Sequence, residues 1–243
     1  MFRNKSANGL PITEKRTVMD HKTYTLLENH MLSCMTDSAH DKEHIYRVLY
    51  NALIIAKTEE NVDTDILITA CLLHDIGRQE QFENPALSHA IVGSEKAYRF
   101  LTEQGYDAAF AQHVKDCIIT HSYRIDAPPA SIEAKILFDA DKLDAAGAVG
   151  IARTLIYKGQ VQEPLYTMNP DGTVCDGTNT DDVSFFEEYK HKLEKLYSGF
   201  HTKTGIAMAK ERQQTAVRYY EALLAEVSAP YVEGRNALEH ILD

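Results

Sequence analysis

The stretch CLLHDIGR, residues 71–78, decides how the chain is interpreted. A histidine and an aspartate stand side by side directly after three apolar residues, Cys71 to Leu73. Polar groups beside a core carry a desolvation penalty unless a partner satisfies them, and the penalty is larger for a carboxylate. Gly77 follows shortly afterwards and lets the chain turn away. His74 and Asp75 therefore need partners from elsewhere in the chain.

The apolar residues around this stretch predict an all-α fold. They recur at i, i+3, i+4 and i+7 over most of the length, and alternating strand-like runs are nearly absent. Asp63, Asp107 and Ser131 stand where helix N-caps are expected. Helices are predicted over residues 22–34, 41–60, 63–76, 85–104, 107–120, 131–157, 183–199 and 202–227.

Residues 159–182, GQVQEPLYTMNPDGTVCDGTNTDD, interrupt the helical pattern. The segment is long and polar and contains the turn signal NPDG, on either side of which LYTM and TVC could pair as a small hairpin. Loops of this length in a compact domain are usually functional or mobile. With 243 residues the chain is long enough for one substantial core. We expect a flexible extension over 1–20 and a single domain over 21–243, ending in C-terminal helices over 183–243.

Composition narrows the class of protein. No apolar run approaches the roughly 18 residues that span a bilayer, and no apolar segment of a secretory signal follows the basic N-terminus; we therefore expect a cytoplasmic protein without membrane contact. The net charge is −11 and the basic residues are scattered, which argues against a nucleic-acid polymer as partner. The four cysteines form no C-x-x-C pair, so they indicate free thiols.

Ionisable residues end the apolar stripes of four predicted helices: His44, His74, His121 and Asp141. A lone histidine on such a stripe is more often a hydrogen-bonded core residue than a ligand. One divalent cation, however, would satisfy His44, His74, Asp75 and Asp141 together. Imidazole with carboxylate suits Mn, Fe, Co, Ni or Zn, and the ligand types do not choose among them.

His44, the HD pair at 74–75 and Asp141 within FDADKLDAAGAVGIAR (138–153) resemble the HD superfamily of metal-dependent phosphohydrolases. The resemblance covers about residues 40–158. It implies an all-α bundle that holds a metal between its central helices, with these four residues as ligands. His89 in LSHAIVG and His121 in IITHSYR resemble the additional ligands of a two-metal branch. With two ions Asp75 would bridge them; with one ion both histidines would line the pocket and hydrogen-bond a substrate phosphate.

Further residues near this pattern are candidates for catalysis and binding. Arg78 stands where two-metal relatives often carry a basic residue and would grip a phosphate. Asp144 would orient the attacking water or accept a substrate hydroxyl. Lys142 and Arg153 are candidate substrate-binding residues, although a solvated helix face also explains Arg153. Arg47 is expected to pair with an inner carboxylate.

The resemblance implies hydrolysis of a phosphate ester or anhydride in a small phosphorylated substrate, with a nucleotide as the first choice. HDIGRQE lacks the acidic pair of guanosine tetraphosphate hydrolases, and no GYP follows His121 as in cyclic-di-GMP phosphodiesterases. Two other classes stay open: a di-iron oxygenase acting on a small hydroxylated or phosphonate substrate, and a catalytically silent binding module. A homodimer through the C-terminal helices is a further option.

Overall fold

The computed structural model describes residues 18–35, 42–122, 127–179 and 183–243. The first seventeen residues of the predicted N-terminal extension lie outside these ranges. The last residue of that extension, Asp20, is the N-cap of the first helix, because its side chain accepts a hydrogen bond from the Thr23 N–H at 2.7 Å.

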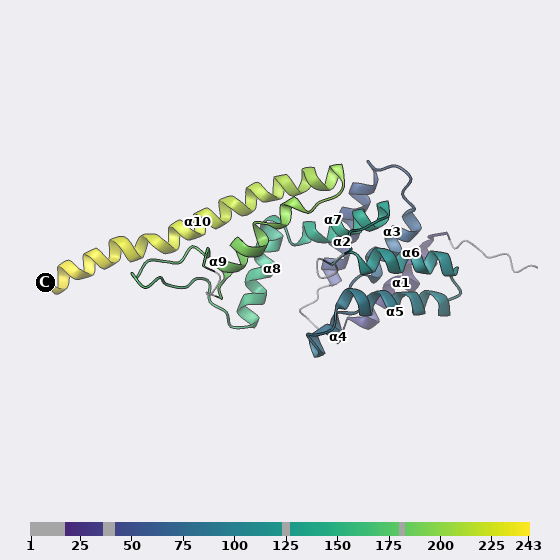
Figure 1. Ribbon diagram of the computed structural model, residues 1–243, viewed down its shortest axis with the longest axis horizontal. Helices are drawn as coiled ribbons and strands as arrows, with labels where there is room; N and C mark the ends of the chain where they lie inside the picture. The colour runs from purple at the N-terminus through teal and green to yellow at the C-terminus, as the bar shows by residue number, and fades with distance from the viewer. Residues whose placement is uncertain (1–17, 36–41, 123–126, 180–182) are drawn as a thin grey trace, which may run out of the picture.

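The regular elements of the described residues are all helices and include no β-strand, which confirms the all-α prediction (Figure 1). Within the described part of the predicted hairpin, Met168 and Val174 form one isolated antiparallel bridge. The described elements, in chain order, are α1 (His21–Cys34), α2 (Lys42–Ala56), α3 (Thr64–Leu73), α4 (Arg78–Glu83), α5 (His89–Glu103), α6 (Ala108–Ile119), α7 (Ile132–Asp144), α8 (Gly147–Gln160), α9 (Phe185–Glu188), the π-helical turn η1 (Tyr189–Leu193), the 3-10 turn η2 (Leu196–Ser198) and α10 (Lys203–Leu242).

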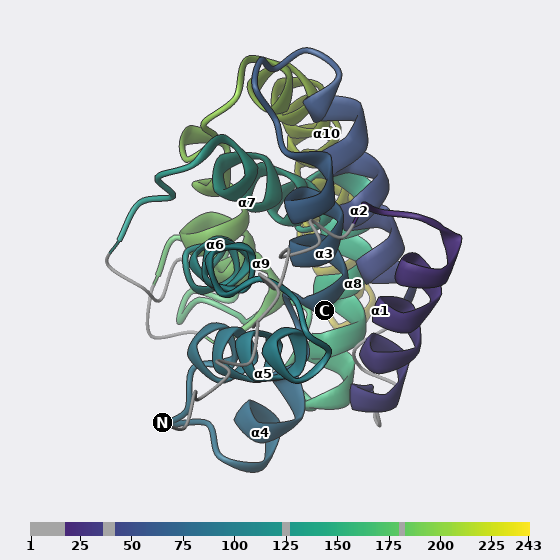
Figure 2. The same cartoon turned by 90° about the vertical axis from the view of Figure 1, so that its right-hand side faces the viewer.

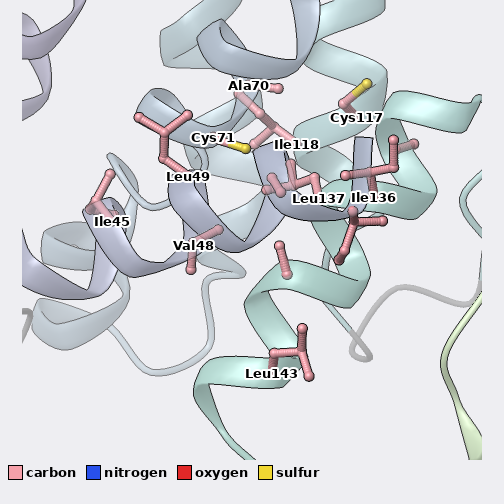
Figure 3. Close-up of a cluster of buried hydrophobic side chains, with 14 of the residues drawn as sticks. Ile45, Val48, Leu49, Ala70, Cys71, Cys117, Ile118, Ile136, Leu137 and Leu143 are labelled. Carbon is pink, nitrogen blue, oxygen red and sulfur yellow. The ribbon is translucent and has the colours of Figure 1, made fainter. Parts of the chain in front are cut away.

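Helix α3 lies at the centre of the bundle and contacts α1, α2, α5, α6 and α7 (Figure 2). Most of its residues are buried, which fits its nearly uninterrupted apolar sequence. Figure 3 shows the side chains that pack around it from α2, α6 and α7. Burying one large aliphatic side chain contributes about 1.5–3 kcal/mol. This core fixes the helix ends that carry the ionisable residues.

Several predicted helices are shorter than expected; α2 ends at Ala56 and not at residue 60, and α5 begins at His89 and not at residue 85. Helix α3 ends at Leu73, so His74 to Gly77 form a turn after the helix. The predicted helix 131–157 is broken between α7 and α8, because Gly147 adopts a φ of +65°, a left-handed conformation that a regular helix excludes. The caps Asp63, Asp107 and Ser131 are confirmed, since the side chain of each accepts a backbone N–H of its helix.

The C-terminal part differs most from the prediction. The predicted helix 183–199 is only one turn of α-helix followed by η1 and η2, and α10 continues to Leu242 in spite of Pro230 (Figure 1). The loop 159–182 contacts α10 where it is described. Tyr166 Oη lies 3.1 Å from Tyr231 Oη, and Arg235 Nη2 donates to the Gly172 carbonyl at 2.7 Å. These long-range contacts join the part of α10 beyond the predicted end at residue 227 to the loop.

Among the described helices, none has both the length and the apolar character that crossing a membrane requires. All four cysteines are described and carry free thiols, as predicted.

Candidate metal centre

The ends of five helices bring the six predicted ligands together. His44 lies in the first turn of α2, His74 and Asp75 follow α3, and His89 begins α5. His121 follows α6, and Asp141 lies in the last turn of α7. All six are buried. Two groups have ligand atoms within 4.8 Å of one another: His44, His74 and Asp75, and Asp75, His89 and His121.

The four imidazoles share one hydrogen-bonding pattern. The Nδ1 atom of each lies at hydrogen-bond distance from an oxygen: 2.7 Å from Asp144 Oδ2 for His44, 2.8 Å from the Cys71 carbonyl for His74, 2.8 Å from Gln81 Oε1 for His89, and 2.6 Å from the Ile118 carbonyl for His121. Since these oxygens accept, each Nδ1 donates its proton and each Nε2 is left to bind a ligand. Metal-binding histidines in proteins have this arrangement.

The Nε2 atoms meet in two pairs, one on each side of Asp75. His44 and His74 Nε2 lie 3.3 Å apart, and Asp75 Oδ2 lies 3.5 and 3.7 Å from them. His89 and His121 Nε2 lie 3.1 Å apart, and Asp75 Oδ1 lies 3.7 and 3.6 Å from them. Two imidazole lone pairs that face each other repel unless a cation or proton lies between them.

Asp141 adds a second carboxylate to the His44 pair, because its Oδ1 lies 3.4 Å from His44 Nε2 and 3.8 Å from His74 Nε2. Asp75 Oδ1, on the His89 side, is buried and accepts no hydrogen bond from the described residues. A divalent cation would complete the surroundings of this oxygen, which lies beside two imidazole nitrogens and has only the ion pair with Arg78. The donor set therefore fits a cation at the His44 pair and a second at the His89 pair.

Burial sets the charge of the histidines. It lowers the pKa of His74 to about 4 and that of His89 to about 3, so both rings are neutral near pH 7 and able to bind a metal. Burial acts in the same direction on His44, but the hydrogen bonds with Asp144 and Asp75 outweigh it and raise the pKa of this ring. His44 therefore tends to hold a proton that a metal would displace.

The carboxylates are held ionised by neighbouring cations. Burial opposes ionisation of Asp75, but the Arg78 guanidinium and the histidines outweigh it, so the pKa of Asp75 lies well below its usual range. Arg78 Nε is 2.9 Å from Asp75 Oδ1, close enough for an ion pair without the alignment of a hydrogen bond. Lys142 Nζ donates to Asp141 Oδ2 at 2.8 Å and is the main cause that lowers the pKa of Asp141 against the effect of burial.

Asp144 lies behind His44. Its Oδ2 accepts from His44 Nδ1, its Oδ1 accepts from Arg47 Nε at 2.6 Å, and Arg153 pairs with Oδ2 from α8. The pairing of Arg47 with an inner carboxylate is thus confirmed. Both carboxylate oxygens of Asp144 are therefore engaged by His44 and the two arginines, and its predicted contact with an attacking water or a substrate hydroxyl stays a prediction. Arg153 belongs to the centre, since it also reaches His44 Nδ1 at 3.1 Å.

Sequence reasoning missed the groups that orient the other histidines. Gln81 lies eight residues before His89, a spacing that carries no general signal. The carbonyls of Cys71 and Ile118 lie three residues before His74 and His121, and histidines near helix C-termini commonly bond the last carbonyls, so this signal was available.

Gly77 is needed for a reason other than the turn. Its φ of −99° is open to any residue, but a Cβ there would lie 2.4 Å from the His89 carbonyl oxygen and 2.5 Å from Gly93 N. The glycine thus lets the first turn of α5 approach the HD turn closely. Lys96 of α5 ties the two together, because its Nζ donates to the Ile76 carbonyl at 2.6 Å.

Comparison with known proteins gives consistent results. The family model of the HD domain matches residues 42–146. The protein YpgQ of Bacillus subtilis (strain 168) is 31% identical over 201 residues, which cover 80% of this chain and 89% of YpgQ. The crystal structure of B. subtilis YpgQ in complex with ADP is similar with a TM-score of 0.66 at 30% identity, over 84% of this chain and 95% of that chain.

Solved structures of HD-superfamily hydrolases are similar as well. One from Bacillus thuringiensis has a TM-score of 0.64 at 28% identity, over 86% of this chain and 96% of that chain. A predicted HD-superfamily hydrolase from an uncultured Thermotogales bacterium has a TM-score of 0.57 at 30% identity, over 84% of this chain and 92% of that chain. The chain therefore belongs to the HD superfamily of hydrolases, a family that binds divalent metals.

Proposed function

We propose that this protein is a divalent-metal-dependent phosphohydrolase that acts on a small phosphorylated substrate, with nucleotides as the substrate class. The observation that carries the proposal is the pair of histidine groups on opposite oxygens of Asp75. Divalent cations held there would lower the pKa of a bound water towards neutrality and polarise phosphoryl oxygens. His44, His74, Asp75 and Asp141 would hold one cation.

His89, His121 and Asp75 would hold the second cation, so Asp75 would contribute to both sites. The observation that supports two ions is the matching geometry of the pairs: in both, the Nε2 atoms lie close together and about equally far from one Asp75 oxygen. Neutral rings at His74 and His89 support metal binding near pH 7.

Local positive charge supports an anionic substrate in spite of the acidic composition. Four cationic side chains, those of Arg47, Arg78, Lys142 and Arg153, pair with three buried carboxylates of the centre. The cations that complete the centre would add to this excess. Arg78 and Arg153, each about a third exposed, would bind phosphate oxygens. The ADP complex of YpgQ supports a nucleotide as the phosphorylated molecule.

The test combines metal content with turnover. Protein purified without added metal is analysed for bound metal, and phosphate and pyrophosphate release from a panel of nucleotides is measured in manganese. Asp75→Ala is expected to abolish both metal binding and turnover, whereas Asp116→Ala, exposed on α6, is expected to change neither. Turnover that persists in Asp75→Ala contradicts the proposal.

The second candidate is a di-iron oxygenase, which the set of four histidines and two carboxylates also suits. It predicts two irons per chain, O₂ consumption with a small hydroxylated or phosphonate substrate, and no release of phosphate from nucleotides. Iron content and an oxygen electrode separate the two functions.

A further inference from the structure

We propose that Tyr157 on α8, together with Phe82 on α4, forms a stacking surface for the nucleobase of the substrate. The inference rests on the proposed function, because it names which part of a nucleotide binds beside the metal centre. It begins from the two arginines that reach the centre from outside the bundle core, Arg78 and Arg153.

The face of α8 that carries Arg153 is apolar and exposed. Tyr157 lies one turn after Arg153, and Val149 one turn before it, so the three share one side of the helix. Ile156 lies beside Tyr157. Tyr157 is 58% exposed and Ile156 64%, although the opposite side of α8 packs against the rest of the protein through Ile151.

Helix α4 repeats this arrangement. Phe82 lies one turn after Arg78, whose guanidinium pairs with Asp75, and it is 69% exposed. Both helices extend towards the lower edge of Figure 1, on the same side of the bundle. Each of these two arginines is thus followed, one turn or about 5.4 Å further along its helix, by an exposed aromatic ring.

The spacing and chemistry of this surface fit a nucleobase. Arginines bind phosphate oxygens, and the base of a nucleotide lies beyond its phosphates at the distance of one sugar. Aromatic side chains stack on bases without choosing among them, because every base has a flat face. We therefore infer that this surface favours nucleotides over phosphates without a base and discriminates little between bases.

The absence of tryptophan from the sequence allows a direct test. Tyr157→Trp introduces a single indole, and stacking of a base on it is expected to quench its fluorescence. In manganese, ADP should quench this variant whereas inorganic pyrophosphate should not. Tyr219→Trp on α10, at another exposed tyrosine, is the matched control and should respond to neither ligand. Equal responses of Tyr157→Trp to ADP and pyrophosphate, or a response to neither while ADP binds, would overturn the inference.

Affinities provide the second readout. Tyr157→Ala is expected to raise the Kd for ADP about 5- to 20-fold, the lower part of the range for one stacked base, and to leave the Kd for pyrophosphate within about twofold. Tyr157→Phe should retain the affinity, and Phe82→Ala should weaken ADP in the same direction. If Tyr157→Ala weakens both ligands equally, or neither, the stacking surface is wrong while the phosphohydrolase stands. If the wild type binds neither ligand, the proposed function fails and the stacking surface with it.

Discussion

Replacing Gly77 by alanine tests whether the HD turn and α5 jointly position the second histidine pair. The added Cβ would lie 2.4 Å from the His89 carbonyl oxygen, and an ordinary contact begins at 3.4 Å, so α5 must retreat by about 1 Å. Both neighbours, His89 O and Gly93 N, are backbone atoms, and no side-chain rotation can relieve the clash. Overpacking of this kind typically costs about 1–3 kcal/mol of stability.

The displacement matters more for metal binding than for stability. Metal–ligand distances tolerate deviations of only about 0.2 Å, several times less than the shift that α5 requires. His89 Nε2 would move away from His121 Nε2, whereas the His44 pair belongs to α2 and α3. We expect Gly77→Ala to lose at least about 10-fold in affinity at the His89 pair, comparable to loss of an orienting group, and less at the His44 pair.

Manganese titration followed by calorimetry and by metal analysis after dialysis measures this effect. The expected result is binding that falls from two ions per chain towards one, with a moderate decrease in the free energy of unfolding. Gly159→Ala is the control, because nothing lies within 4 Å of its added Cβ; it should leave metal binding unchanged and stabilise α8 by up to about 1 kcal/mol. Unchanged metal binding in a folded Gly77→Ala protein would refute the reasoning.

Three further predictions concern groups around the centre. Asp144→Asn replaces the carboxylate that orients His44, and we expect metal affinity at that pair to fall about 10- to 100-fold in titrations, while a change confined to stability would contradict this role. Below its raised pKa, His44 carries a proton that a bound metal would displace, so manganese binding near pH 7 should release protons and weaken on acidification. Calorimetry in buffers of different ionisation enthalpy measures this proton release. His74, with a pKa of about 4, should contribute no proton. Asp139→Ala removes the acceptor of the Thr202 N–H and hydroxyl at the start of α10, and it should lower the free energy of unfolding in urea by about 1–3 kcal/mol for each buried donor left unpaired. An unchanged urea midpoint would show that water replaces the carboxylate.

Four of the ligands, His44, His74, His121 and Asp141, could be predicted because they lie at the ends of apolar stripes, whereas His89 was predicted only from the resemblance to two-metal HD proteins. Which face of a helix is buried follows from local spacing, so a histidine at the end of such a face, like His44 or His121, must lie inside whatever the arrangement of the helices. Which histidines pair with each other could not be predicted from this local spacing. Whether His89 meets His121 or His74 depends on how α5 packs against α6 and against the HD turn, where Gly77 contacts Gly93.

The wrong boundary within 131–157 shows how non-local contacts build the outer part of the centre. In a continuous helix Arg153 would lie nine residues beyond Asp144, about 13.5 Å along the axis and away from it. The break at Gly147 turns α8 back, and Arg153 instead contacts Asp144 and His44. A Cβ at Gly147 would lie 2.9 Å from Arg212 Cβ of α10, a contact that local periodicity cannot reveal. The same break sets the direction of α8, which carries Tyr157 one turn beyond Arg153, so the stacking residue that we infer depends on a glycine whose role lies in tertiary packing.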